Sequence, residues 1–153
     1  MRRKDKEITD KNKMLEIISK AQVCYLGMSD NNKPYVVPMN FGYVEDTIYF
    51  HCALEGKRNS ILKKDPHVCL VFNTDNQLVN DIPQDDWTMY YKSVIAFGKA
   101  EFILDVPEKQ KAINIMFHHY GGKDYPLPKS VLERTMFIKV KIEKMTGKGS
   151  IPK

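Results

Sequence analysis

The sequence predicts a mainly β fold, in which six to seven antiparallel strands form a small β-barrel with peripheral helices. Three observations support this prediction. Short runs of β-branched and aromatic residues recur along the chain, turn-forming residues separate them at hairpin spacing, and only three stretches have helical periodicity. This combination is typical of a small antiparallel barrel.

One domain is expected to account for the chain. The 153 residues have a mass of 17.8 kDa, and 42% of them are apolar, which is enough to bury a hydrophobic core. No run of about 18 apolar residues occurs, so no membrane-spanning helix is expected. The first residues are too highly charged to lead into a signal peptide, and a cytoplasmic location is therefore expected. We predict a single domain over 1–153, with an N-terminal helix at about 9–20, a barrel at about 23–144 and a short C-terminal tail.

The first third of the chain is predicted to hold one helix and three strands. Thr9 or Asp10 can cap a helix that ends near Lys20, because apolar residues recur there at helical spacing. Runs of β-branched and aromatic residues follow, and polar turn-forming residues separate them. The expected strands span 23–28, 35–44 and 47–50.

The remaining elements follow from the same patterns. Residues 59–64 are predicted to form a short helix that Asp65-Pro66 ends, because the residue before proline avoids the helical region. A second helix begins near Pro107 and stops at Gly121-Gly122. Strands are expected at 68–72, 87–104 and 135–144. Residues 73–84 are expected to form a loop or a loose hairpin end, residues 121–130 a loop, and residues 146–153 a tail that is flexible or folds onto a partner.

Pro38 and Gly98 mark irregular positions within the predicted strands. A proline cannot donate to a sheet ladder, so Pro38 is expected at a sheet edge, at a bulge or at the mouth of a ligand site. Gly98 lies inside the longest β-rich run and suggests a bend of the kind that barrels need at their corners.

The net charge of +5 belongs to the ends of the chain. Residues 1–20 and 139–153 carry +3 and +4, and the segment between them carries −2. A nucleic-acid site would cluster its basic residues on a folded element, and no such cluster or helix-turn-helix pattern is present. We therefore expect no nucleic-acid partner.

The cysteines are expected to be structural. Cys24, Cys52 and Cys69 are odd in number, lie in apolar strand-like segments and form no Cys-x-x-Cys pair. The pairing of His51 with Cys52 does not suggest a zinc site, because adjacent strand residues point to opposite faces. No metal site is predicted.

The segment around His51 is the best candidate for a binding site. A strand ends at His51, Gly56 breaks the chain, and Lys57 and Arg58 precede a helical turn. Free backbone N–H groups at a helix start, together with Lys and Arg side chains, are suited to a phosphate group. Surface loops also carry Gly, Lys and Arg for solubility alone, and the residues by themselves leave both interpretations open.

Three motifs in order resemble one known family. They are the segment Pro34 to Tyr43, the segment Ile48 to Lys57, and the segment Tyr91 to Ala100. Together they resemble the pyridoxamine 5′-phosphate oxidase-like split β-barrel flavoproteins, and they are most similar to the branch that contains the 5-nitroimidazole resistance (Nim) proteins. Thr146-Gly147-Lys148 after a strand is also typical of that branch. The resemblance covers about residues 8–148.

The resemblance implies a homodimer with FMN at the subunit interface, and no membrane partner. His51 matches the active-site histidine, Lys57 the phosphate-binding residue with Arg58 beside it, and Ser93 a position that touches the edge of the isoalloxazine. A histidine that is bonded to phosphate or backbone without a chemical role is the alternative for His51. The implied cofactor-binding residues are Val36, Val37, Pro38, Met39, Asn40, Phe50, His51, Lys57, Arg58 and Ser93.

The implied function is an FMN-dependent oxidoreductase that reduces a small acceptor such as a nitroaromatic. True pyridoxamine phosphate oxidases carry a C-terminal Trp/Arg/His set, and this chain has no tryptophan after Trp87, so that activity is not expected. Two alternatives stay open. One is a flavin-binding store or sensor without catalysis. The other is a haem-binding split barrel, for which His51, His118 and His119 are candidate axial ligands. For His118 and His119 the preferred explanation is their position at a helix C-terminus, where an imidazolium interacts favourably with the helix dipole.

Overall fold

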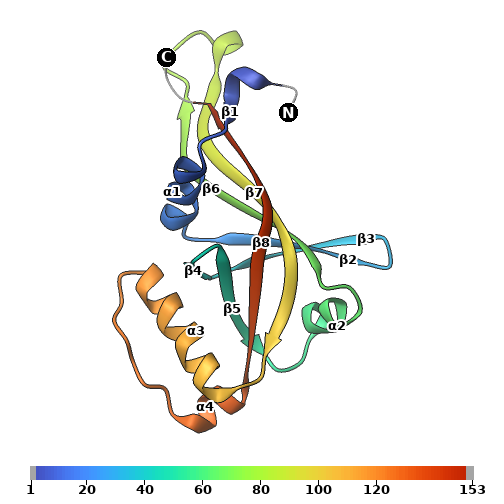
Figure 1. The fold of residues 1–153 in the computed structure, drawn as a ribbon. Coiled ribbons are helices and arrows are strands. Elements are labelled where there is room, and N and C mark those ends of the chain that lie inside the picture. The colour runs from blue at the N-terminus through green and yellow to red at the C-terminus, as the bar shows by residue number, and fades with distance from the viewer. Residues whose placement is uncertain (1–2, 151–153) are drawn as a thin grey trace.

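A single antiparallel sheet of eight strands forms the body of the protein (Figure 1). The computed structural model describes residues 3–150. The order of the strands in the sheet is β3-β2-β6-β7-β8-β5-β4, and β1 pairs with β8. The strands are β1 (Glu7–Ile8), β2 (Cys24–Asp30), β3 (Lys33–Met39), β4 (Gly42–Val44), β5 (Thr47–Ala53), β6 (His67–Val79), β7 (Thr88–Ile103) and β8 (Thr135–Ser150).

The sheet curls into a barrel that is open along one seam. β3 and β4 lie at opposite ends of the strand order, yet only residues 40–41 separate them in the chain. The sheet must therefore curve until its two edges meet at this link. No ladder joins β3 to β4 within residues 3–150, so the barrel is split there. The predicted mainly β split barrel is confirmed, with the two-residue β1 as an additional strand.

Four α-helices surround the sheet, and three of them were predicted. Asp10 caps the first helix by accepting from the N–H of Asn12 at 2.8 Å, and Asp105 caps the third by accepting from the N–H of Glu108 at 3.0 Å. The fourth helix begins in the last two residues of the predicted loop 121–130 and continues through residues for which no element was predicted. The helices are α1 (Lys11–Lys20), α2 (Lys57–Lys64), α3 (Val106–His119) and α4 (Lys129–Glu133), with 3₁₀ turns η1 (Lys4–Lys6) and η2 (Gln84–Asp86). None of the helices in the described part of the chain is long and apolar enough to cross a bilayer.

The buried side chains form two clusters. The larger one fills the barrel and includes Phe41, Phe50 and Phe72, all completely buried. The smaller one lies between α3, α4 and the outer side of the sheet, and Phe137 is its largest member. In the alternation of β8, Phe137 shares a face with Lys139, Lys141 and Glu143, a pattern that is typical of a solvent-facing side, yet Phe137 is buried. Because α3 and α4 cover that face, this end of β8 is buried on both sides.

The predicted strand 35–44 is interrupted. β3 ends at Met39 and β4 begins at Gly42, with Phe41 completely buried between them. The ring of Phe41 lies 5.1 Å from that of Phe72 and 4.2 Å from that of His119, measured between centroids, and its N–H donates to the Tyr120 hydroxyl at 3.1 Å. Contacts with α3 therefore turn the chain inward at a point where the local sequence is strand-like.

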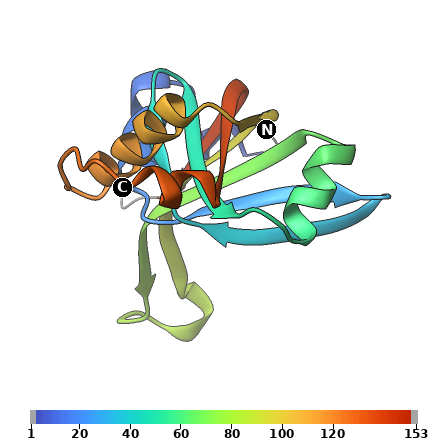
Figure 2. The ribbon, with the colours of Figure 1, turned by 90° about the horizontal axis from the view of Figure 1, so that it is seen from below.

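The far end of the barrel decides between the alternatives for two segments. Residues 73–79 continue β6 and pair with β7, so they form a hairpin end and not a loop. Residues 146–150 continue β8 and pair with β7 instead of forming a flexible tail, while 151–153 lie outside the described residues. The paired strands β6 and β7 project from the body as an arm (Figure 2). In both places the neighbouring strand supplies hydrogen-bond partners to a polar segment, and the sequence pattern cannot show those partners.

Candidate functional site

An open depression of about 650 Å³ lies where the ends of β3 and β5 meet α2 and the start of β8. The pairing of β5 with β8 brings these segments together, because His51 is opposite Phe137 and Ala53 is opposite Thr135. Met39 forms part of the floor and is almost fully buried. The lining residues are Pro38, Met39, Asn40, His51, Cys52, Ala53, Arg58, Arg134 and Thr135.

A buried amide holds α2 against the end of β5. Asn59 is 2% exposed, and its Nδ2 donates to the carbonyls of Ala53 and Leu54, both at 2.9 Å. Gly56, with φ +140°, makes the turn into the helix, in a conformation that a side chain would strain. Arg58 lies in the first turn and is brought to the depression by this anchor.

Two guanidinium groups line the depression without a carboxylate beside them. Within residues 3–150, neither Arg58 nor Arg134 forms an ion pair. Arg58 Nη1 contacts the Met39 sulfur at 2.9 Å, and its buried Nε has no hydrogen-bond partner in that part of the chain. A buried donor without a partner is costly. The site is therefore suited to an anion with several acceptor oxygens, such as a phosphate.

His51 lies at the edge of the depression. Its ring centroid is 6.1 Å from that of Phe137. Desolvation by the surrounding protein, and then the positive charge of Arg58, lower the pKa of His51 below its ordinary 6.5. The imidazole is therefore neutral at pH 7, with one nitrogen able to donate a hydrogen bond and the other able to accept one.

We expect Arg58→Ala to raise the pKa of His51, because it removes the positive charge that opposes protonation. The pKa stays below 6.5, since desolvation, the larger cause, remains. A ¹H–¹⁵N NMR titration of the imidazole measures the change. Arg3→Ala is the control, because Arg3 pairs with Asp5 and is absent from the lining of the depression. An unchanged His51 midpoint in Arg58→Ala would show that the two side chains do not interact.

Comparisons with known proteins agree with this architecture. A protein-family model described as pyridoxamine 5′-phosphate oxidase matches residues 10–149. The chain belongs to this family. No curated protein sequence matches the chain significantly. The family that the three sequence motifs predicted is confirmed.

Solved structures contain similar folds. A candidate 5-nitroimidazole antibiotic resistance protein from Bacteroides thetaiotaomicron is 36% identical, with a TM-score of 0.85 over 94% of this chain and 86% of that one. A flavocytochrome from Azotobacter vinelandii is 20% identical, with a TM-score of 0.84 over 99% of this chain and 72% of that one. An FAD- and haem-binding protein from Mycobacterium smegmatis is 15% identical, with a TM-score of 0.85 over 96% of this chain and 74% of that one. The last two show likeness of fold alone.

Of the residues that the sequence predicted for the binding site, five line the depression: Pro38, Met39, Asn40, His51 and Arg58. Pro38 also lies on an edge strand of the sheet, where its missing N–H breaks no ladder.

The other predicted residues lie elsewhere. Val36 is 59% exposed on the outer face of β3, whereas Phe50 is completely buried in the barrel. Val37 is half-buried and packs against the core. Lys57 Nζ lies over the ring of Tyr35, 4.6 Å from its centroid.

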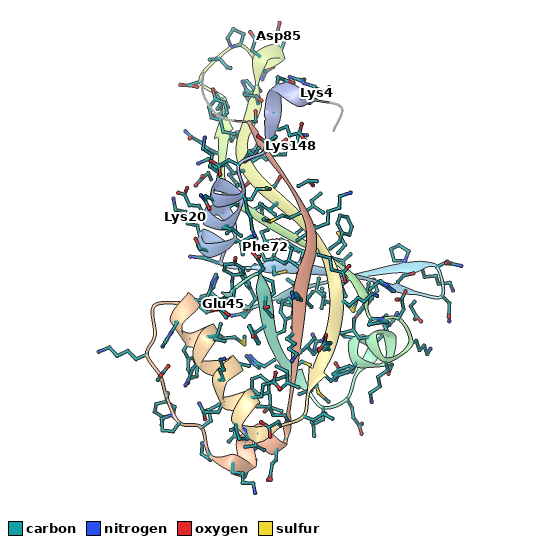
Figure 3. All side chains as sticks on the ribbon, viewed as in Figure 1. Lys4, Lys20, Glu45, Phe72, Asp85 and Lys148 are labelled. Atoms are coloured by element: carbon teal, nitrogen blue, oxygen red, sulfur yellow. The ribbon has the colours of Figure 1, made fainter. Side chains whose placement is uncertain are left out.

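Ser93 is far from His51 within one chain. Ser93 is opposite Lys148 on β8, whereas His51 is opposite Phe137 on the same strand. The two partners are separated by 11 residues, which corresponds to roughly 36 Å of extended strand. Figure 3 shows Lys148 near the arm, away from the α4 end of β8. A single flavin ring cannot contact both His51 and Ser93 of one subunit.

The two other histidines considered as haem ligands also lie away from the depression. His118 Nε2 pairs with Asp124 at 2.8 Å. His119 Nε2 lies 2.8 Å from the carbonyl oxygen of Ala21. Both are at the C-terminal end of α3, as the sequence predicted.

Arg134 is the most important lining residue that the sequence analysis missed. The chain has 24 Lys and Arg residues, and its only arginines are Arg2, Arg3, Arg58 and Arg134. Guanidinium groups recognise phosphate and carboxylate oxygens through paired donors, which lysine cannot do. Arginine at two internal positions of a lysine-rich chain therefore indicates an anion-binding role for both residues. No comparable sequence feature marks Cys52, Ala53 or Thr135, because only the pairing of β5 with β8 brings these residues to the site.

A second cavity, of about 440 Å³, lies between the N-terminal segment, α1 and the base of the arm. Its lining includes four lysines and five acidic residues. Several of these charges are paired with one another, as in the contact of Lys92 Nζ with Asp75 at 2.9 Å. Acidic side chains outnumber the lysines in this lining, whereas the depression at His51 is lined by two arginines and no carboxylate.

Proposed function

We propose that this protein is an FMN-dependent oxidoreductase whose cofactor phosphate binds in the depression beside His51. The observation that carries the proposal is that two guanidinium groups line the depression and form no ion pair within residues 3–150, where the buried Nε of Arg58 also has no hydrogen-bond partner. A phosphate dianion would satisfy these donors with charge-assisted hydrogen bonds. Lys57, the first residue of α2, does not line the depression, and its Nζ would have to leave the ring of Tyr35 to contact the phosphate.

When bound, the flavin would supply the redox chemistry between a reduced donor and an acceptor. The chain itself would orient the reactants and move protons. His51, mostly neutral because its pKa is lowered, would donate a hydrogen bond to the acceptor, and its protonated form would transfer a proton and regain one from solvent. Asn40 and Pro38 would form the wall beside it.

A nitroaromatic is the acceptor that we favour. The 36% identical Bacteroides protein is a candidate 5-nitroimidazole resistance protein, and the similarity extends over 94% of this chain. Reduction of a nitro group takes electrons from the reduced donor and protons from the site, and the oxygens leave as water.

We also propose that two copies of the chain complete the site. The outer face of the sheet exposes Tyr25, Val36, Ile95 and Phe97, which are between 39% and 59% accessible. Strand pairing places them together, because Tyr25 and Ile95 both lie opposite Val71. Ser93 is on the same face of β7 as Ile95 and Phe97. If this apolar face is the dimer interface, Ser93 of one copy can approach the depression of the other, which a single chain does not allow.

The purified protein is expected to retain flavin absorption bands through desalting, or to take up FMN when it is added. The wild-type holoprotein should turn over a nitroimidazole with a reduced nicotinamide as donor and sediment as a dimer.

His51→Ala should keep the flavin and lose turnover, because it removes the proton donor and leaves the arginines. His67→Ala is the control, since His67 is exposed and pairs with Asp65 outside the depression.

The outcomes separate the alternatives. A protein that takes up no flavin refutes the proposed cofactor. A protein that binds FMN without reducing any acceptor is a flavin store or sensor. Unchanged turnover in His51→Ala leaves the flavoenzyme in place and refutes the role of His51.

A further inference from the structure

We propose that Arg134 is a second phosphate-binding residue of the depression and that the buried Lys109 is its positioning residue. The inference rests on the proposed binding of FMN, and it identifies residues that neither the sequence motifs nor the family resemblance assigned.

Lys109 is a buried cation that interacts with backbone. It lies on α3 and is 5% exposed. Its Nζ donates to the carbonyl oxygen of Leu132 at 2.9 Å and to that of Thr135 at 2.8 Å. Within residues 3–150 no carboxylate pairs with it. Burial of an ammonium group is costly, and the two hydrogen bonds offset part of that cost. They also fix the backbone at the corner between α4 and β8.

Arg134 lies between the two carbonyls that Lys109 holds. It is the C-cap residue of α4, with φ −89° and ψ 7°, and its N–H donates to the carbonyl of Leu132. The next residue, Thr135, begins β8 opposite Ala53, and its hydroxyl donates to the carbonyl of Val131 at 2.8 Å. The backbone on both sides of Arg134 is therefore tied down, while its exposed side chain lines the depression.

Lys109 and Arg134 have different roles: Lys109 fixes the backbone, and Arg134 can contact a ligand. Lys109 does not line the depression, so it cannot contact a ligand there itself. Arg134 has no ion-pair partner in the described part of the chain and is available to a ligand. With Arg58 on the α2 side and Arg134 on the β8 side, a phosphate between them would receive charge-assisted hydrogen bonds from two elements. Loss of the Lys109 clamp should weaken FMN binding only through Arg134.

The test is a double-mutant cycle on flavin affinity. Dissociation constants for FMN and for riboflavin, which lacks the phosphate, are measured by flavin fluorescence for the wild type, Arg134→Gln, Lys109→Met and the double variant. We expect Arg134→Gln and Lys109→Met each to weaken the affinity for FMN about tenfold and to leave the affinity for riboflavin unchanged. In the Arg134→Gln background, Lys109→Met should change FMN affinity by less than about twofold.

Two controls separate positioning from general loss of structure. Arg3→Gln removes the same charge outside the depression and should leave FMN affinity unchanged. Lys109→Met should lower the melting temperature equally in both backgrounds, because it leaves two carbonyls unsatisfied whether or not Arg134 is present. Arg134→Gln changes an exposed side chain and is expected to fold, so it tests the phosphate contact even where Lys109→Met does not fold.

Three results would overturn the inference. The first is FMN affinity that Arg134→Gln does not change. The second is an equal loss of riboflavin affinity. The third is an equal effect of Lys109→Met on FMN affinity in both backgrounds. In each case the wild type still binds FMN, so the proposed function stands. A wild type that binds neither flavin refutes the proposed function together with this inference.

Discussion

Gly98→Ala is expected to destabilise the protein by about 3 kcal/mol or more. A Cβ on Gly98 would clash with the carbonyl oxygen of Lys141 and lie 2.9 Å from Cγ1 of Val140. Both contacts belong to β8, the strand that pairs with β7 at this point, and the register of the two strands shifts between Phe97 and Gly98. Because the obstacle is backbone in the middle of the sheet, it cannot move aside as a flexible side chain can.

Chemical denaturation of Gly98→Ala and Gly149→Ala measures this effect against a matched control. A Cβ on Gly149 meets Cδ1 of Ile8 at 3.3 Å, which is the end of a flexible side chain. We expect Gly149→Ala to change the free energy of unfolding by no more than about 0.5 kcal/mol. Equal stability of the two variants would contradict the role of Gly98 in the bend of β7.

Phe50→Ala is expected to lower the free energy of unfolding by about 3–5 kcal/mol, because it removes a completely buried ring from the barrel. The family resemblance placed Phe50 beside the cofactor, whereas the structure places it in the core, opposite Ile138 on β8. The cofactor role of its side chain therefore predicts a loss of flavin affinity, and the core role predicts a loss of stability without flavin.

Denaturation of the apoprotein distinguishes these two roles. Leu104→Ala is the control, since Leu104 is 76% exposed and its truncation should cost less than about 0.5 kcal/mol. A Phe50→Ala apoprotein as stable as the wild type, with weakened FMN binding, would assign the ring to the cofactor instead of the core.

The candidate site was predictable in part, because some of its residues lie next to strong local patterns. His51 and Arg58 were found because a strand, a glycine and a basic pair follow one another within eight residues. Arg134 was missed, although it completes the charge of the same depression. The segment before β8 has no motif of its own, and 75 residues separate Arg134 from Asn59, the anchor of α2. Only the pairing of β5 with β8 brings these parts of the chain together.

Local sequence patterns were sufficient to predict the mainly β class, the three longer helices, the bend at Gly98 and the family. These features depend on local periodicity, on capping residues and on short motifs, which neighbouring residues specify. The tertiary structure was needed for the break between β3 and β4, the burial of Phe137, the extension of β6 and β8, and the placement of Arg58 and Arg134 at one depression. In each of these cases the stabilising free energy comes from partners that are distant in the sequence. Phe41 and Phe137 pack against α3 or its last residues. The polar ends of β6 and β8 pair with β7, and the corner that holds Arg134 pairs with β5.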